Sequence, residues 1–310
     1  MRVAIIDLGT NTFHLMLAEV SDTSHSIFYR ERIPVKVGER GINKGEITPE
    51  AMQRALEALR AFQGTIEKNQ VEKIFGTATS AIRNASNGVS LVQEIEKQTG
   101  IEIEIISGIR EAELIQLGAR EALDFGDEKN LVMDIGGGSI EFIIADKSTT
   151  YWMRSFEIGG QRLVERFHKS DPIVSEEIQN LQSYFEEKLI ELYDACAEFQ
   201  PKVLVGCSGT FDTLSDIYCE EEGIQRDPND TEFPLPLESF RKIHDALLQK
   251  NRAERLRIPG MIEMRVEMIV VASILVQFIV EKLDLQKIRV SAYALKEGIL
   301  FNVINQIQAK

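Results

Sequence analysis

The sequence predicts an α/β fold built from two similar halves. Two stretches share one pattern, in which an apolar run reaches an aspartate, turns through glycine and small polar residues, and resumes as an alternating apolar run: VAIIDLGTNTFHLMLAEV at 3–20 and LVMDIGGGSIEFII at 131–144. Each stretch reads as two strands joined by a tight turn. Between and after these stretches, strand patterns alternate with helix patterns, which is typical of sheets covered by helices.

The two stretches correspond position by position. The matched pairs are Asp7 with Asp134, Gly9 with Gly136, Thr12 with Ser139, and His14 with Glu141. A single such stretch could be only a glycine-rich hairpin, but two at the heads of two halves indicate a duplicated unit with a cleft between the copies. A length of 310 residues fits two domains of about 150 each. We place the boundary in the turn around 124–129, which gives domains 1–125 and 126–310.

In the first half, the elements follow in order. Residues 1–40 read as strands with turns, and 47–70 as a helix that Thr48 caps and Pro49 begins. Residues 71–88 read as a strand that leads into a loop and a helix, and a further helix follows. The segment IEIEIIS at 101–107 alternates like a strand, and 108–125 reads as a helix.

The second half restarts with the glycine-rich hairpin. Residues 151–167 then read as a strand leading into a helix, and Ser175 to about Glu198 as one long helix. The apolar strand at 202–207 breaks into another helix, and several helices are expected from there to the end. Met268 to Val280 is uncharged and apolar but too short to cross a bilayer, so we expect a buried helix.

Composition limits the function classes. The chain is 44% hydrophobic and 27% charged, as in ordinary globular proteins, and its formal net charge of −14 argues against a general grip on nucleic acid or an anionic membrane. A polyanionic ligand would have to be held locally. Basic residues do concentrate at 30–44 and 241–265, either as solvated faces or as a track for phosphates.

Cysteine usage and the N-terminus indicate a reducing, cytoplasmic location. The three cysteines, Cys196, Cys207 and Cys219, are odd in number and form no C-x-x-C pair, which argues against a disulfide framework and a zinc site. Asp7 interrupts the first apolar run where a signal peptide would continue.

Three loops share one chemical style, and each emerges from an apolar strand. They are DLGTNT at 7–12, DIGGGS at 134–139 and GCSGT at 206–210. Glycine lets backbone N–H groups face a ligand, and serine or threonine adds hydroxyl donors, so such loops form anion-binding nests. We expect these loops to bind phosphate through Asn11, Thr12, Gly136, Gly137, Gly138, Ser139, Gly209 and Thr210.

Other phosphate and hydrolase chemistries fail on spacing. A cysteine-nucleophile phosphatase loop needs arginine six positions after the cysteine, where Cys207 is followed by Thr213. The G-x-S-x-G elbow would need glycine at 210, which is Thr210. The sequence contains no Walker A loop and no H-E-x-x-H motif.

A set of motifs in this order resembles the exopolyphosphatase and guanosine pentaphosphate phosphatase family. The set is DLGTNTFH, GTATSAIRNA, ISGIREAELI, DIGGGSIE, GCSGT, PGMIEMRVE and SAYALKEGI, and it spans residues 3–300. The resemblance implies the two-domain actin-like fold of the ribonuclease H-like group, shared with Hsp70 and sugar kinases, with the active site in the interdomain cleft. It also implies a homodimer. The chain departs from the family pattern at Ile140, Glu267 and Lys296.

The resemblance also implies roles for particular residues. Glu111 matches the catalytic glutamate that orients and deprotonates the attacking water, although its position near a helix N-terminus also fits a capping role. Asp134 and Glu141 match ligands of Mg²⁺, which prefers oxygen donors; the alternative is a turn cap and a solvated glutamate. Arg83 matches a phosphate-clamping arginine, where the alternative is a surface salt bridge. Whether His14 and Arg265 contact substrate is left open.

From these observations we expect an exopolyphosphatase that removes the terminal phosphate of inorganic polyphosphate with Mg²⁺ and water. Longer family members carry an additional C-terminal helical region, so shorter chains are the expected preference here. One alternative is hydrolysis of guanosine pentaphosphate at the same site. Another is an ATP-binding regulator on the same fold, because fold alone does not fix function.

Overall fold

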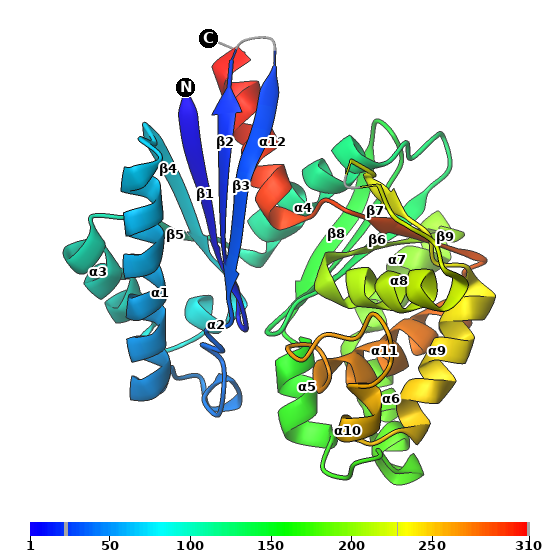
Figure 1. The fold of residues 1–310 in the computed structure, drawn as a ribbon. Coiled ribbons are helices and arrows are strands. Elements are labelled where there is room, and N and C mark those ends of the chain that lie inside the picture. Colours follow the sequence, from blue (N-terminus) through cyan, green and yellow to red (C-terminus); the bar gives the residue numbers. More distant parts are fainter. Residues whose placement is uncertain (22–23, 228, 309–310) are drawn as a thin grey trace. The chain divides into compact units, whose positions relative to one another are not determined.

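The computed structural model describes residues 1–21, 24–227 and 229–308, and it divides into two compact units. The first unit is Met1–Gly118 with Leu295–Lys310, and the second is Ala119–Ala294. Each unit has its own sheet and its own buried apolar cluster. Figure 1 shows the sheets and the helices that cover them.

The sheet of the first unit has the order β3-β2-β1-β4-β5. Its strands are β1 (Arg2–Leu8), β2 (Phe13–Val20), β3 (His25–Ile33), β4 (Lys73–Ala78) and β5 (Ile103–Ile105). β1, β2 and β3 form an antiparallel meander, while β4 and β5 continue the sheet parallel to β1. Helices α1 (Pro49–Lys68) and α3 (Gly88–Thr99) lie on one side of this sheet, and α12 (Leu295–Gln308) lies on the other (Figure 1).

Short helices and α4 complete the first unit. They are η1 (Ile42–Lys44), α2 (Ser80–Arg83) and α4 (Gly108–Ala122), and the division between the units falls within α4. The expected start of α1 is confirmed, because the Thr48 hydroxyl accepts a hydrogen bond from the Ala51 N–H at 3.3 Å and Pro49 is the first helical residue.

The second unit repeats this strand order. Its strands are β6 (Asn130–Ile135), β7 (Ile140–Ala145), β8 (Thr150–Phe156), β9 (Val203–Cys207), β10 (Glu232–Phe233) and β11 (Lys287–Ser291). Read from one edge the order is β8-β7-β6-β9-β11-β10, an antiparallel meander followed by two parallel strands and one added edge strand. The expected α/β fold of two similar units is thereby confirmed.

Helices pack around α11 (Met268–Lys282) and against the second sheet. The others are α5 (Gly160–Phe167), α6 (Ser175–Lys188), α7 (Ile190–Phe199), α8 (Ser208–Glu222), α9 (Leu237–Gln249) and α10 (Arg252–Arg255). α11 contacts α5, α6 and α9, whereas α7 and α8 contact the strands. As predicted, α11 is buried. No helix among the described residues is long and apolar enough to cross a membrane.

Two predictions of secondary structure were wrong. The single helix expected from Ser175 to about Glu198 is broken at Leu189, which leaves the helical region and is fully buried, because α6 packs on other helices while α7 packs on β7 and β8. The C-terminal part was expected to be helical, but it also contains β10 and β11. Ile288 and Val290 of β11 are buried, as alternation in a short strand predicts.

The division into units also differs from the predicted domains 1–125 and 126–310. The final helix, α12, belongs to the first unit because it packs on β1 and β2. The helix α12 also packs closely against α4. Gly298 allows this contact, since a Cβ at this position would overlap the α4 backbone at Leu114. Local sequence patterns do not reveal such a return of the chain.

Candidate functional site

The two hairpins predicted from the sequence have the same register. In the first unit Asp7 lies opposite His14 on the neighbouring strand, and in the second unit Asp134 lies opposite Glu141. In both hairpins the turn after the aspartate has room for glycine but not for a side chain. A Cβ on Gly9 would lie 2.9 Å from the carbonyl oxygen of Thr12, and a Cβ on Gly136 would lie 3.0 Å from that of Ser139. The predicted correspondence is confirmed.

In the second unit, residues 136–139 form a turn that we call the glycine loop. The carbonyls of 136–138 accept hydrogen bonds of 2.8–3.0 Å from the backbone N–H groups of 159–161, where α5 begins. Because N–H and C=O point in opposite directions across a planar trans peptide, the amides of 137–139 face away from α5. Several amides in one direction form an anion-binding nest.

The glycine loop tolerates no side chain where α5 meets it. A Cβ on Gly159 would lie 2.5 Å from backbone atoms of Gly137 and Gly138. Arg162 adds a further contact, since its Nε donates to the carbonyl of Gly138 at 2.8 Å. The amides that face away from α5 are therefore held in place by tight packing behind them.

In the first unit, residues 9–12 form the equivalent turn, which we call the threonine loop. Its carbonyls at Thr10 and Asn11 accept hydrogen bonds from the N–H groups of Gly38 at 3.1 Å and Lys36 at 2.8 Å. By the same peptide geometry, the amides of Asn11 and Thr12 point away from the segment that follows β3. The predicted donors Asn11 and Thr12 thus belong to a loop whose backbone is held by hydrogen bonds on the opposite side.

Asp134 and Glu141 form a buried carboxylate pair at the base of the glycine loop. Their exposed fractions are 5% and 1%, and they are direct cross-strand neighbours. The hydroxyl of Ser208 donates to Asp134 at 2.7 Å, and the hydroxyl of Ser155 donates to Glu141 at 2.6 Å. The alternative of a solvated glutamate does not describe Glu141, which is almost fully buried.

The donor chemistry of this pair fits a hard divalent cation. Two carboxylates on neighbouring strands repel each other when both are ionised, and a bound Mg²⁺ relieves that repulsion through oxygen ligands and retained waters. Among the described residues no group of three or more histidine, cysteine, aspartate or glutamate side chains gathers as a closed metal site. The pair would supply carboxylate oxygen ligands to such an ion.

The third predicted loop joins β9 to α8. Ser208 has φ +67°, a left-handed conformation that is uncommon for a residue with a side chain, and its hydroxyl bonds Asp134. A Cβ on Gly209 would overlap the guanidinium of Arg265, so this arginine lies on the first turn of α8. The Thr210 hydroxyl is buried and forms no hydrogen bond with the described residues. A helix N-terminus with these groups favours anions.

Arg83 and Glu111 meet in the first unit. Arg83 Nη1 lies 2.8 Å from Glu111 Oε2 and 3.2 Å from the carbonyl oxygen of Ile106, and the two side chains are 15% and 8% exposed. The alternative for Arg83 was a surface salt bridge, but this ion pair is largely buried. Ser107 accepts a hydrogen bond from the Arg110 N–H at 3.1 Å, so the N-terminus of α4 has a cap other than Glu111.

The three loops, Arg83 and Glu111 follow the carboxyl ends of parallel strands. In the first unit, β1, β4 and β5 end beside one another and lead to the threonine loop, Arg83 and Glu111. In the second unit, β6 and β9 lead to the glycine loop and to Ser208. Ligand sites of open α/β sheets lie at this edge.

Sequence reasoning missed Ser155 and Ser208 as partners of the carboxylates. Ser208 lies inside the GCSGT motif, where its hydroxyl could have been matched to Asp134 because β6 and β9 were both expected to be strands. Ser155 gives no such signal, since only the register of β7 with β8 places it opposite Glu141.

Comparisons with known proteins agree with the resemblance found in the sequence. The model of the Ppx/GppA phosphatase family matches residues 16–306. A crystal structure of an exopolyphosphatase from Cytophaga hutchinsonii is 41% identical, covers 99% of this chain and 98% of its own, and superposes with a TM-score of 0.96.

Two further relatives are more distant. The Haemophilus influenzae protein named "Putative exopolyphosphatase" is 28% identical over 310 residues, which cover 99% of this chain and 93% of that protein. The Aquifex aeolicus member of the Ppx/GppA family shares the fold, with 24% identity, a TM-score of 0.80 and coverage of 99% and 98% of the two chains. The chain is therefore an enzyme, and it belongs to the Ppx/GppA phosphatase family.

Proposed function

We propose that this phosphatase hydrolyses the terminal phosphate of linear inorganic polyphosphate and releases orthophosphate. The observation that carries the proposal is the arrangement in the second unit, where the outward amides of the glycine loop adjoin the buried pair Asp134 and Glu141. Amides bind phosphate oxygens, and a carboxylate pair beside them suits the cation that accompanies a polyphosphate. The exopolyphosphatase name of the 41% identical Cytophaga hutchinsonii protein supports this substrate.

In this proposal the loops and Arg83 position the terminal phosphate. The amides of 137–139 and of the threonine loop supply neutral donors, and the hydroxyls of Ser139 and Thr210 add two more. A guanidinium has five N–H donors in a planar fork that matches phosphate oxygens, so Arg83 is the proposed charged contact of the terminal phosphate. Positioning and charge neutralisation provide most of the catalysis of phosphoryl transfer.

Glu111 is the proposed general base. Its carboxylate takes a proton from a water molecule while the water oxygen bonds to the terminal phosphorus, and the bond from that phosphorus to the bridging oxygen breaks. The leaving oxygen keeps the electron pair as the new end of the shortened chain. Arg83 is 2.8 Å from Glu111 and fixes the direction of the carboxylate. The proposal requires Glu111 and the glycine loop to act on one substrate.

Asp134 and Glu141 would hold Mg²⁺, and Ser208 and Ser155 would orient their carboxylates through the hydrogen bonds already described. When bound, the ion supplies positive charge that neutralises the terminal phosphate oxygens. Cytoplasmic location and a homodimer stay predictions, supported by the sequence pattern and by the family resemblance respectively.

Guanosine pentaphosphate is the substrate to compare. It would present a terminal phosphate to the same loops, so its turnover separates a general phosphatase from one that requires a phosphate chain. An ATP-binding regulator without phosphatase activity is the weaker reading, because the chain belongs to a phosphatase family.

Phosphate release tests the proposal directly. Wild type, Glu111→Gln and Asp134→Asn are assayed on tripolyphosphate, on longer polyphosphates and on guanosine pentaphosphate, across a Mg²⁺ titration and with chelator. We expect Glu111→Gln to lose about 10²-fold or more in kcat and Asp134→Asn to need more Mg²⁺. Full metal-dependent turnover by Glu111→Gln would show that Glu111 is not the base. An unchanged Mg²⁺ titration of Asp134→Asn would show that Asp134 is not a ligand of the ion.

A further inference from the structure

We propose that Arg32, Lys36 and Lys44 of the first unit form a basic strip that binds the phosphates beyond the one being removed. This inference rests on the proposed function and deepens it, because it makes an inorganic phosphate chain, rather than a nucleoside, the preferred occupant of the enzyme. The strip comes from the basic segment at 30–44, which the proposed mechanism leaves unused.

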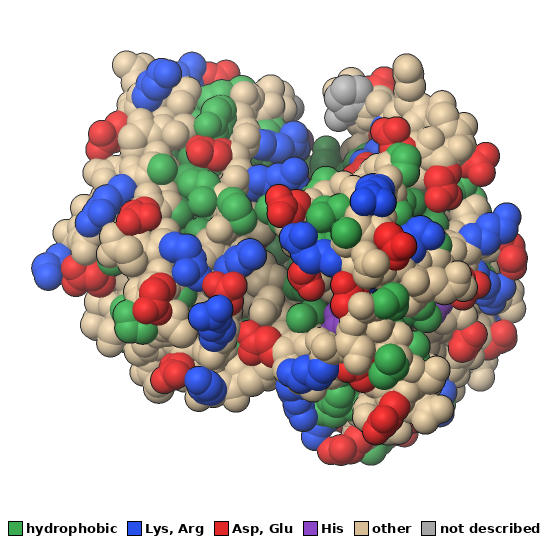
Figure 2. Space-filling model, turned by 60° about the horizontal axis from the view of Figure 1, so that its bottom comes forward, with side chains coloured by type: hydrophobic (Ala, Val, Ile, Leu, Met, Phe, Trp, Pro, Cys, Tyr) green, Lys and Arg blue, Asp and Glu red, His purple; other side chains and the backbone are tan. Residues whose placement is uncertain are grey.

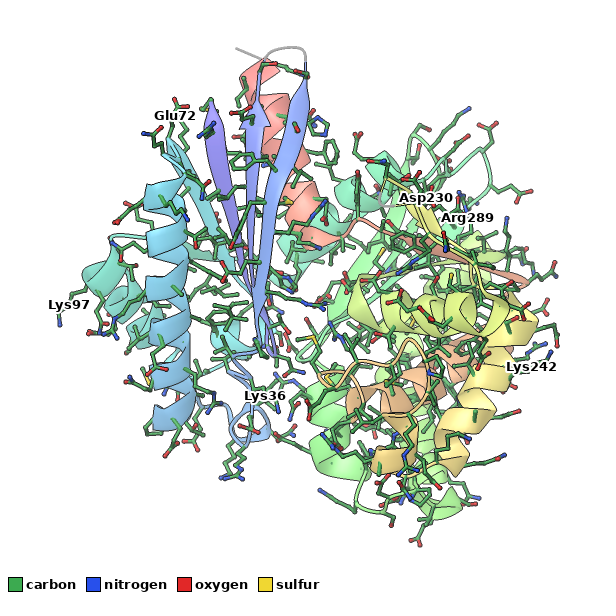
Figure 3. The ribbon with its side chains drawn as sticks, in the orientation of Figure 1. Lys36, Glu72, Lys97, Asp230, Lys242 and Arg289 are labelled. Carbon is green, nitrogen blue, oxygen red and sulfur yellow. The ribbon has the colours of Figure 1, made fainter. Side chains whose placement is uncertain are left out.

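The strip is attached to the proposed phosphate-binding residues at both of its ends. At one end the N–H of Lys36 donates to the Asn11 carbonyl at 2.8 Å, so the backbone of Lys36 is bonded directly to the threonine loop. Figure 3 labels Lys36 near the ends of the strands of the first sheet. At the other end the carbonyl of Gly45, next to Lys44, accepts from the N–H of Ser86 at 2.8 Å, three residues beyond Arg83. The strip therefore runs from the threonine loop toward Arg83.

Strand pairing adds Arg32 to the same edge. Arg32 of β3 lies opposite His14 of β2, which in turn lies opposite Asp7 at the end of β1. Cross-strand neighbours project to the same face of a sheet, so Arg32 lies on the face of Asp7 and His14, close to where the threonine loop begins.

The cations of the strip are available to a ligand. Arg32, Lys36 and Lys44 are exposed, and their side chains form no ion pair or hydrogen bond with the residues that the structure describes. The acidic residues of the segment are engaged elsewhere, which leaves the strip with uncompensated positive charge in a chain of net charge −14. Glu31 accepts a hydrogen bond from the Tyr29 hydroxyl at 3.0 Å on the other face of β3, and Glu39 pairs with Arg54.

On the face shown in Figure 2, lysine and arginine side chains are interspersed with aspartate and glutamate side chains. Mixed surfaces of this kind do not attract a polyanion, whereas a short run of unpaired cations does.

The backbone of the strip also departs from ordinary conformations. Lys36 has φ +50° and Arg40 has φ +60°, a left-handed region in which glycine is the usual residue. Strained backbone conformations of this kind cluster at functional sites. A charged side chain at such a position therefore suggests a function for that side chain. A lysine and an arginine in such positions, four residues apart, supply charge that glycine would not.

The strip suits phosphates better than a nucleoside. A base needs an aromatic or apolar face to stack on, and residues 30–44 contain no aromatic side chain. The nearest exposed ring, that of Phe28, precedes the strip, and the guanidinium of Arg2 already stacks on one of its faces, with Cζ 5.5 Å from the ring centroid. Charge alone therefore determines what the strip recognises.

Lys36→Gly is a sharp test because it deletes the charge and keeps the N–H that bonds Asn11. Glycine also accepts φ +50° without strain, and this gain offsets its greater freedom in the unfolded chain, so the melting temperature is expected to stay within about 3 °C. Arg32→Ser is combined with it. Gln70→Gly, at φ +55° in the same unit, controls for the backbone change. Lys97→Ala, on α3 (Figure 3), controls for the loss of one exposed charge.

Two readouts are needed. Titration calorimetry measures binding of a long-chain polyphosphate and of tripolyphosphate, and phosphate release measures KM for both and for guanosine pentaphosphate. We expect each strip substitution to weaken long-chain binding about two- to fivefold and the double variant about tenfold, with a smaller effect on tripolyphosphate. Higher salt should reduce the difference between wild type and variants, because the contacts are exposed.

The outcomes separate the strip from the proposed function. Equal losses on short and long chains, no loss on either, or the same loss in Lys97→Ala would overturn the strip. If the wild type released no phosphate from polyphosphate, the proposed function would fail, while calorimetry would still decide whether the strip binds the chain.

Discussion

Breaking the Arg83–Glu111 ion pair should destabilise the first unit strongly, and removing both charges should cost less than the two single losses added together. The pair is 2.8 Å long and its side chains are only 15% and 8% exposed, so Arg83→Met leaves a largely buried carboxylate without this partner. Removing one member of a buried pair costs about 3–5 kcal/mol, and the remaining exposure of Arg83 places the expected value near 3 kcal/mol. Glu111→Gln keeps the volume and an acceptor, so it should cost about 1–2 kcal/mol.

The double variant Arg83→Met/Glu111→Gln provides the decisive number. If the charges interact, its loss in the free energy of unfolding should be smaller than the sum of the single losses by about 1.5–2 kcal/mol. Urea unfolding followed by circular dichroism measures this loss, because the single tryptophan, Trp152, lies in the second unit and does not report on the first. Losses that add within about 0.5 kcal/mol would show that the pair contributes no coupling and would refute Arg83 as the residue that orients Glu111.

Three further predictions test the loops and one buried histidine. Gly159→Ala should lower phosphatase activity and stability together, because its Cβ would meet backbone of the glycine loop at 2.5 Å; an active, equally stable variant would contradict the packing. Gly209→Ala should displace only the flexible end of Arg265, so activity should change while the melting temperature does not, and unchanged kinetics would show that the place of Arg265 is unimportant. Burial lowers the pKa of His244, whose Nδ1 lies 3.1 Å from Ser273 Oγ, below 6.5. The unfolded chain then binds more protons, so stability is full above about pH 6.5 and falls as the pH drops below it; His244→Gln should flatten this fall in unfolding measurements from pH 7.5 to 5.

Local patterns predicted those parts of the structure that depend on neighbours in the chain. The hairpins were predictable because the aspartate, glycine and alternation lie within one short stretch, and their registers follow from it. Thr48 and Pro49 marked the start of α1 for the same reason. The break at Leu189 was not predictable, because the apolar pattern continues through it and only the different packing partners of α6 and α7 require it.

The parts of the site that could not be predicted depend on tertiary contacts. The resemblance pointed to Arg83 and Glu111 separately, 28 residues apart, and gave no reason to expect an ion pair between them. Their meeting depends on the parallel order of β4 and β5, which brings the segments after both strands to the same edge. Arg265 is similar, because a loop after α10 carries it to Gly209 and no local motif indicates that contact.

The duplication explains why the two hairpins carry different chemistry on one scaffold. Both have an aspartate at the end of the first strand, but the cross-strand position holds Glu141 in the second unit and His14 in the first. The next strand continues the contrast, with Ser155 opposite Glu141 and Arg32 opposite His14. Two carboxylates and a hydroxyl favour a cation, whereas an imidazole and a guanidinium beside the threonine loop favour an anion. A substrate that is a polyanion with a bound metal ion needs both, and the basic strip extends the anion-binding half.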